Sequence, residues 1–192
     1  MNQKHSSQSV LLIIDMIEGF VNEGPLFDPY IRTIVPTLRR TMDFFKQQHW
    51  PMIAINDHHH SNSCEFKAFP PHCLSDTIES KLIKELHDEQ LLVLHKNSVN
   101  AFMSPQFQAW FHDAPIYKRY VIGGCVTDIC ILHFALSLNS YFHEHDIDST
   151  VVVLNDGVAT YDLENHNRTE YHNAAINLMK QVGIHLIESE SL

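Results

Sequence analysis

The chain has 192 residues, of which 44% are hydrophobic and 19% are charged, a size and balance typical of one globular domain with a sizeable core. Its 13 Lys and Arg against 23 Asp and Glu give a formal charge of −10, which argues against nucleic acid and anionic membrane surfaces as partners because both repel an acidic protein. The 15 histidines are many for this length and point to metal binding, since imidazole is the commonest metal ligand.

Residues 1–9 form a polar N-terminal segment, and the apolar run after it, residues 10–14, is too short for a signal-peptide core or a membrane span. The four cysteines show no CxxC pairing. In a chain without a signal peptide we expect them as reduced thiols. The sequence thus predicts a cytoplasmic protein with one domain over residues 10–192.

Short apolar runs alternate with longer stretches of helical period along the chain. Strands are predicted at residues 10–14, 52–55, 91–94, 119–122, 151–154 and 184–187. Helices are predicted at residues 31–48, 78–86, 105–111, 128–145 and 168–182. Apolar runs without polar alternation are typical of strands covered on both faces, so the pattern predicts a three-layer α/β/α fold with a central, mainly parallel, Rossmann-like sheet. Ligands of such sheets bind at the carboxyl ends of the strands, where the candidate site residues are therefore sought.

Two ionisable residues stand directly at predicted strand ends. Asp15 follows the first apolar run, in LLIIDMIEGF, and is either a catalytic carboxylate or the N-cap of a helix. Lys96 follows the third run, in LLVLHKNSVNAF, where a lone lysine is more often a surface charge. Neither residue decides the function by itself.

A second group of candidate residues follows the second predicted strand. Asp57 and His59 are two positions apart, so in an extended chain their side chains share one face. Glu65 and His72 come from the loop that follows. Two carboxylates and two imidazoles suit a divalent cation, and the competing interpretation is a solvated polar loop.

Cys130 lies in GGCVTDIC, after the fourth predicted strand. Glycines ahead of Thr and Asp predict a strand, a tight turn and a capped helix, whose positive end would acidify the thiol and present amides as oxyanion donors. The competing interpretation is a small buried core residue. An acid, a lysine and a cysteine at the ends of three parallel strands favour a cysteine nucleophile.

Three motifs give the sequence a family resemblance that runs from about residue 10 to residue 187. They are the strand-end acid in LLIIDMIEGF, the lysine in LHKNSVNAF, and GCVTDIC. Together they resemble the isochorismatase-like cysteine hydrolases, and DHH followed by EFKAFPPH resembles the metal loop of the nicotinamidase/pyrazinamidase branch. The resemblance implies the isochorismatase-like form of the three-layer fold.

The resemblance implies a catalytic triad of Asp15, Lys96 and Cys130. Asp15 would accept the thiol proton, Lys96 would hold the two groups in place, and Cys130 would attack an amide carbonyl to form a thioester. The backbone N–H groups of Val126 and Cys130 would receive the oxyanion, beside a cis peptide bond between Cys125 and Val126.

The resemblance also implies one divalent metal ion, with zinc expected and iron or manganese as options. The four ligands implied are Asp57, His59, Glu65 and His72. The ion would receive the ring nitrogen of a small aromatic carboxamide, nicotinamide foremost, and Phe20 and Phe69 would sandwich the ring. Dimers and tetramers are common in the family, so a homo-oligomer is expected.

Two positions depart from the family pattern, Ile17 where many members have Gln and Phe134 where many have Thr. The alternatives inside the family are metal-free: an N-carbamoyl amidohydrolase or an isochorismatase-type vinyl ether hydrolase. Outside it, the alternatives are a metal hydrolase with a structural Cys130 and a non-enzymatic scaffold. The retained cysteine and the full ligand set favour the amidohydrolase.

Overall fold

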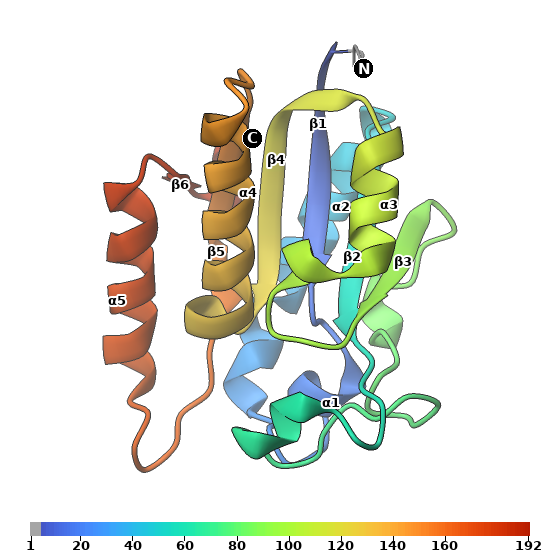
Figure 1. Ribbon diagram of the computed structural model, residues 1–192, viewed down its shortest axis with the longest axis vertical. Coiled ribbons are helices and arrows are strands. Elements are labelled where there is room, and N and C mark those ends of the chain that lie inside the picture. Colours follow the sequence, from blue (N-terminus) through green and yellow to red (C-terminus); the bar gives the residue numbers. More distant parts are fainter. Residues whose placement is uncertain (1–4) are drawn as a thin grey trace.

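Six parallel strands form one central sheet in the computed structural model, which describes residues 5–192 (Figure 1). Their order across the sheet is β3-β2-β1-β4-β5-β6. The strands are β1 (His5–Ile14), β2 (Met52–Asp57), β3 (Leu91–Lys96), β4 (Ile116–Cys125), β5 (Thr150–Ala159) and β6 (His185–Ile187). Every neighbouring pair is parallel, so the predicted parallel sheet is confirmed.

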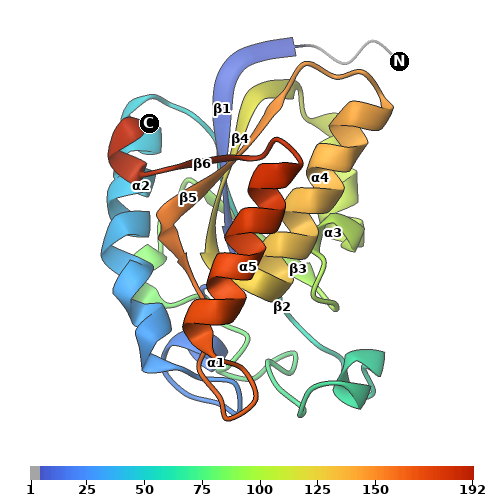
Figure 2. The ribbon, with the colours of Figure 1, turned by 90° about the vertical axis from the view of Figure 1, so that its left-hand side faces the viewer.

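Helices cover both faces of this sheet. They are α1 (Glu18–Val21), α2 (Val35–Gln47), α3 (Pro105–Asp113), α4 (Leu132–Glu144) and α5 (Arg168–Gln181). α2 packs on one face, and α3, α4 and α5 pack on the other (Figure 2). The predicted three-layer α/β/α architecture is therefore confirmed. No helix in residues 5–192 has the length and apolar character that a bilayer crossing requires.

β1 lies in the middle of the sheet, and its residues 10–14 are completely buried. Its side chains alternate between the two faces. Leu11 and Ile13 join the core beneath α2, while Leu12 and Ile14 join the core beneath α3, α4 and α5. Burial on both sides explains why this run is apolar without polar alternation.

The predicted helix over residues 78–86 is wrong. Only Lys84–Leu86 forms a short 3₁₀ turn, and the residues before it are irregular. Several of their backbone groups bond to the segment around α1 and do not continue a helix: the Glu18 N–H donates to the Lys81 carbonyl, and the Ile83 N–H donates to the Met16 carbonyl. The helical spacing of apolar residues therefore reflects burial of side chains such as Ile83 beneath the sheet.

The predicted helix over residues 31–48 is divided near Pro36. Pro29–Ile34 is a 3₁₀ helix, and α2 begins at Val35 with Pro36 in its first turn. Proline lacks an N–H and clashes with a preceding helical turn, so it fits the start of a helix and not its interior.

Near the N-terminus, β1 already begins at His5, so part of the predicted polar segment over residues 1–9 belongs to the sheet.

The direction of the chain across the sheet reverses between β1 and β4. β1 continues to β2 and β3 on one side, whereas its other neighbour, β4, continues to β5 and β6. Such a reversal opens a crevice at the carboxyl ends of the two central strands, where ligands of parallel α/β sheets bind. The functional site is therefore expected where β1, β2, β3 and β4 end.

The Asp28 carboxylate ties the segment after α1 to the loop before α5. It accepts hydrogen bonds from the N–H groups of Tyr30 and Asp162 and from the guanidinium of Arg168. Burial alone would raise the pKa of Asp28, but these hydrogen bonds outweigh burial and lower it. We expect Asp28→Asn to reduce the free energy of unfolding by about 2 kcal/mol near pH 7, because it weakens hydrogen bonds to a buried charge.

This stabilisation requires the ionised carboxylate. Because the pKa of Asp28 is lower in the folded state, the stabilisation is complete above the ordinary carboxyl pKa of about 4 and is lost as the pH falls through the folded-state value. Urea unfolding of both proteins at about pH 7 and about pH 3 should show a difference that shrinks in acid. Equal stability of the two proteins near pH 7 would contradict this account.

Candidate active site

Three ionisable side chains meet at the ends of β1 and β3 and in the turn after β4. Nζ of Lys96 lies 2.8 Å from Oδ2 of Asp15 and 3.8 Å from Sγ of Cys130. All three residues are buried. Lys96 is therefore not a surface charge, and Asp15 does not cap α1, whose N-cap is Ile17. The structure brings together the three residues that the sequence singled out as a triad.

The backbone directs Asp15 into the site. Asp15 has a φ of 54°, in the left-handed region that Asp tolerates better than most residues. Its Oδ1 accepts a hydrogen bond of 2.7 Å from the N–H of Asp57. Burial and the nearby charge of Asp57 raise the pKa of Asp15 to about 6, against the opposing effect of Lys96. A carboxyl group with this pKa is suited to accept and return protons near neutral pH.

Cys130 lies in a π-helical turn, Thr127–Ile131, that leads into α4. Turns of this kind occur frequently at functional sites. Burial raises the pKa of the Cys130 thiol well above its ordinary value, although Lys96 acts to lower it. The expectation of a thiol acidified by a helix start is therefore wrong, because burial outweighs the nearby positive charge. A buried thiol needs a base beside it to react, and the Asp15 carboxylate lies within 4.8 Å of its sulfur.

The backbone before Cys130 agrees with the family resemblance, since the peptide bond between Cys125 and Val126 is cis. The predicted tight turn is wrong, because Gly124 belongs to β4. A Cβ on Gly124 would lie 2.0 Å from the carbonyl oxygen of Ile14, so glycine allows β4 to run close beside the end of β1. Val126 and Cys130 line one pocket, as the implied oxyanion hole requires.

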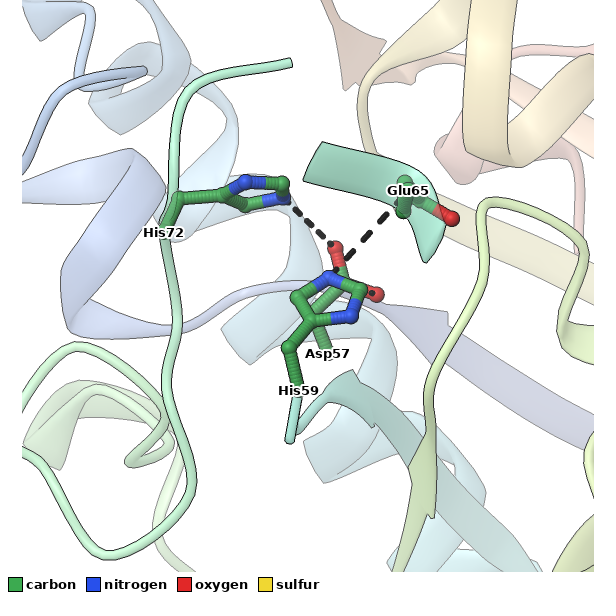
Figure 3. A group of neighbouring side chains, drawn as sticks. All are labelled: Asp57, His59, Glu65 and His72. Atoms are coloured by element: carbon green, nitrogen blue, oxygen red, sulfur yellow. Dashed lines mark ion pairs between the residues drawn. The ribbon is translucent and has the colours of Figure 1, made fainter. Parts of the chain in front are cut away.

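The four predicted metal ligands form one cluster beside the triad (Figure 3). Each offers a ligand atom, and these atoms all lie within 4.8 Å of one another. Nε2 of His59 is 3.4 Å from Oδ1 of Asp57 and 3.9 Å from Oε1 of Glu65. Nε2 of His72 is 3.7 Å from Oδ2 of Asp57. Asp57, His59 and His72 are buried, which rules out a solvated loop.

Hydrogen bonds behind the cluster orient its ligand atoms. Nδ1 of His59 bonds to Oδ1 of Asn97, and Nδ1 of His72 bonds to the carbonyl of Pro70. Each bond leaves Nε2 of the ring directed into the cluster, and Nε2 of His59 is buried without a partner. Metal-binding histidines are held in this way, so the residues present fit a divalent cation.

A pocket joins the triad to the metal cluster. Its lining residues are Phe20, Leu26, Asp57, Glu65, Phe69, His72, Val99, Val126, Ile129, Cys130 and Tyr161. The rings of Phe20 and Phe69, the two residues expected to contact substrate, lie 5.8 Å and 6.1 Å from the ring of His72. The mostly apolar lining, with a few polar groups among it, suits a small aromatic molecule.

The family model of the isochorismatase domain matches residues 9–191. The chain belongs to the isochorismatase family. It is 30% identical to Nicotinamidase 1 of Arabidopsis thaliana, over 92% of this chain and 80% of that protein. The predicted family and the predicted enzyme class, a hydrolase, are confirmed, and this relative supports the nicotinamidase branch.

Solved structures of the isochorismatase family share the fold. The pyrazinamidase of Pyrococcus horikoshii in complex with zinc has a TM-score of 0.78 at 22% identity, covering 94% of this chain and 99% of that chain. The N-carbamoylsarcosine amidase of Thermoplasma acidophilum has a TM-score of 0.78 at 20% identity, covering 96% of this chain and 98% of that chain. At these identities the likeness establishes the common fold.

Sequence reasoning missed two polar residues of this isochorismatase-family site, Asn97 and Tyr161. Asn97 directly follows Lys96 at the end of β3, where the rule of inspecting strand ends would have found it. Tyr161 lies two residues after β5, which ends at Ala159. The predicted strand ended at residue 154, because the polar pair after it hides the continuation, and Tyr161 was therefore not inspected.

Replacing Lys96 with methionine tests the electrostatic part of the triad. Lys96 lowers the pKa of Cys130, so Lys96→Met should move alkylation of Cys130 by iodoacetamide to higher pH. Mass spectrometry of the alkylated protein across a pH series measures this shift, and the exposed Cys64 serves as internal reference. Lys84→Met, on an exposed turn, is the control, and an unchanged Cys130 profile would return Lys96 to a purely structural role.

Proposed function

We propose that this protein is a metal-assisted cysteine amidohydrolase. It releases ammonia from a small heteroaromatic carboxamide, nicotinamide foremost, through a thioester on Cys130. The observation that supports this proposal is that one pocket is lined by Cys130 and by three of the clustered acidic and histidine residues, Asp57, Glu65 and His72. A nucleophile alone fits many acyl transfers, whereas a neighbouring cation site selects substrates that carry a ligand atom.

The first half of the reaction uses Asp15 as base and Cys130 as nucleophile. Asp15 takes the proton of the thiol, and the sulfur forms a bond to the amide carbon while the carbonyl electron pair moves onto oxygen. The N–H groups of Val126 and Cys130 donate to that oxygen. Lys96, whose pKa is held well above its ordinary value by Asp15, Asp57 and Cys130 despite its burial, stays charged throughout.

Collapse of the tetrahedral intermediate breaks the carbon–nitrogen bond. The proton held by Asp15 passes to the departing nitrogen, so ammonia leaves and a thioester remains on Cys130. Asp15, ionised again, takes a proton from water as the water oxygen attacks the thioester carbon. The sulfur leaves with the electron pair, recovers a proton from Asp15, and the product is a carboxylic acid.

Asp57, His59, Glu65 and His72 are the residues that would hold the metal ion. When bound there, the ion supplies a Lewis acid that accepts a lone pair from the substrate ring. Zinc, iron and manganese all suit two imidazoles and two carboxylates. The chain itself orients the substrate by enclosing the ring between apolar walls that include Phe20 and Phe69.

Ammonia release from a substrate panel tests the proposal. Purified protein is incubated with nicotinamide, pyrazinamide, benzamide and an N-carbamoyl amino acid. We expect turnover of the first two and much weaker turnover of benzamide, because benzamide has the same ring size but no ring nitrogen for the cation site. Preferred hydrolysis of the N-carbamoyl compound would instead support the metal-free alternative, and no ammonia from any of the four would contradict an amidohydrolase.

A further inference from the structure

One polar residue of the pocket has no role in the proposed mechanism. The charged lining residues belong to the metal cluster, and Cys130 is the nucleophile. The other lining residues are apolar except for Tyr161. Tyr161 lies in the loop between β5 and α5, so it reaches the pocket from a part of the sheet that contributes neither to the triad nor to the metal cluster.

The hydroxyl of Tyr161 is a donor without a partner. The residue is only 9% exposed, and within residues 5–192 no group forms a hydrogen bond with the hydroxyl. Burial raises the pKa of Tyr161 to about 12, with further contributions from the nearby groups of Asp128 and Cys130. The hydroxyl therefore stays protonated near the nucleophile. The hydroxyl oxygen is not one of the fully buried, unpartnered side-chain atoms of residues 5–192, so it stays accessible, and a bound molecule with an acceptor atom could receive its hydrogen bond.

Tyr161 is held in place by His166. Nε2 of His166 lies 2.7 Å from Oδ2 of Asp128, and Nδ1 lies 3.2 Å from the carbonyl oxygen of Tyr161. The ring also stacks between Tyr161 and Tyr171, at centroid distances of 4.2 Å and 4.0 Å.

These contacts connect the loop of Tyr161 to the turn of the nucleophile. Asp128 belongs to the π-helical turn Thr127–Ile131 and stands two residues before Cys130. The His166 ring therefore fixes the position of Tyr161 relative to Cys130 through the Asp128 carboxylate. Such a connection is unnecessary for a residue that only fills space.

We propose that Tyr161 is a substrate-binding residue whose hydroxyl donates a hydrogen bond to an acceptor atom of the bound carboxamide, and that His166, held by Asp128, is the residue that positions it. This inference rests on the proposed amidohydrolase function and assigns to it a further contact. The substrate class it selects is a planar amide with an acceptor atom within reach of the Tyr161 hydroxyl.

The test compares two tyrosines that stack on the same histidine. Tyr161→Phe removes one oxygen from the pocket, and Tyr171→Phe removes the same atom from a residue that is 44% exposed and does not line the pocket. With nicotinamide, we expect Tyr161→Phe to raise KM about 3- to 10-fold at nearly unchanged kcat, the effect of losing one neutral hydrogen bond made equally in ground and transition states. Tyr171→Phe should leave KM unchanged.

The positioning role of His166 has a separate readout. His166→Gln should raise KM by a similar factor in the otherwise unaltered protein and have no further effect on KM in the Tyr161→Phe variant, because it acts through that hydroxyl. An additive effect would overturn the positioning role. Equal KM values in Tyr161→Phe and Tyr171→Phe would overturn the substrate contact while the amidase function stands. If the unaltered protein neither hydrolyses nor binds nicotinamide in calorimetry, both the proposed function and this contact are wrong.

Discussion

Replacing Cys130 with alanine is expected to abolish amide hydrolysis, lowering kcat/KM by about 10⁴-fold or more, because the covalent route disappears with the sulfur. The fold should persist, since Cys130 is a small side chain at the end of a core that contains many larger ones. Ammonia release measures the first expectation, and thermal unfolding followed by circular dichroism measures the second.

The matched control for this variant is Cys64→Ala. Cys64 is exposed, so its loss should leave turnover unchanged, and brief iodoacetamide treatment should still inactivate the protein through Cys130. If Cys130→Ala keeps activity within about tenfold of the unaltered protein, Cys130 is a structural residue. The reaction would then belong to a metal hydrolase in which the cation activates water.

Replacing His59 with alanine is expected to lower the affinity of the site for metal by about 10- to 100-fold. The value of kcat/KM for nicotinamide should also fall strongly. The side chain of His59 is completely buried, and its Nε2 points toward Asp57 and Glu65. This nitrogen has no hydrogen-bond partner. Loss of one ligand from such a set weakens metal binding, and it disturbs the orientation of the substrate that the ion would hold. Elemental analysis of protein purified without added metal gives the metal content directly.

His60→Ala is the matched control for the metal site, because His60 is exposed and follows His59 immediately. It should keep both metal and activity. Exhaustive chelation of the unaltered protein should reproduce the His59→Ala effect on nicotinamide turnover, while Cys130 should still react with a small alkylating agent. The metal-assisted function would be contradicted if well-folded, fully active protein contained less than about a tenth of an equivalent of any divalent ion.

The strand-end rule directed attention to Asp15, Asp57 and Lys96 because of one property of parallel sheets, and the family resemblance supplied the triad and the full ligand set. The strands run in one direction, so their carboxyl ends meet at one edge. Asp15 and Asp57 stand at or next to the ends of two buried strands, and Lys96 ends the edge strand β3. Apolar runs identify such strands reliably, since burial on both faces leaves little room for polar residues.

Other features depend on tertiary contacts that no local pattern reveals. The segment over residues 78–86 has helical spacing, yet its backbone bonds to the segment around α1. The environment of Cys130 is set by burial beneath several elements and not by its place at a helix start. Tyr161 was missed because β5 continues through polar Asn155 and Asp156, which the apolar pattern treats as the end of a strand.

Some residues of the site stand at strand ends and others lie on loops, and this difference determines which of them can change during evolution. Asp15 and Lys96 are held by the sheet itself, where almost any displacement would disturb the core. Glu65, Phe69 and Tyr161, by contrast, lie on connecting segments, where insertions and substitutions are tolerated more readily. Substitutions within residues 66–71 or 160–165 can therefore alter which molecule is accepted while the triad and the four clustered metal ligands keep their positions. Directed evolution toward new amides would have most freedom in these two segments.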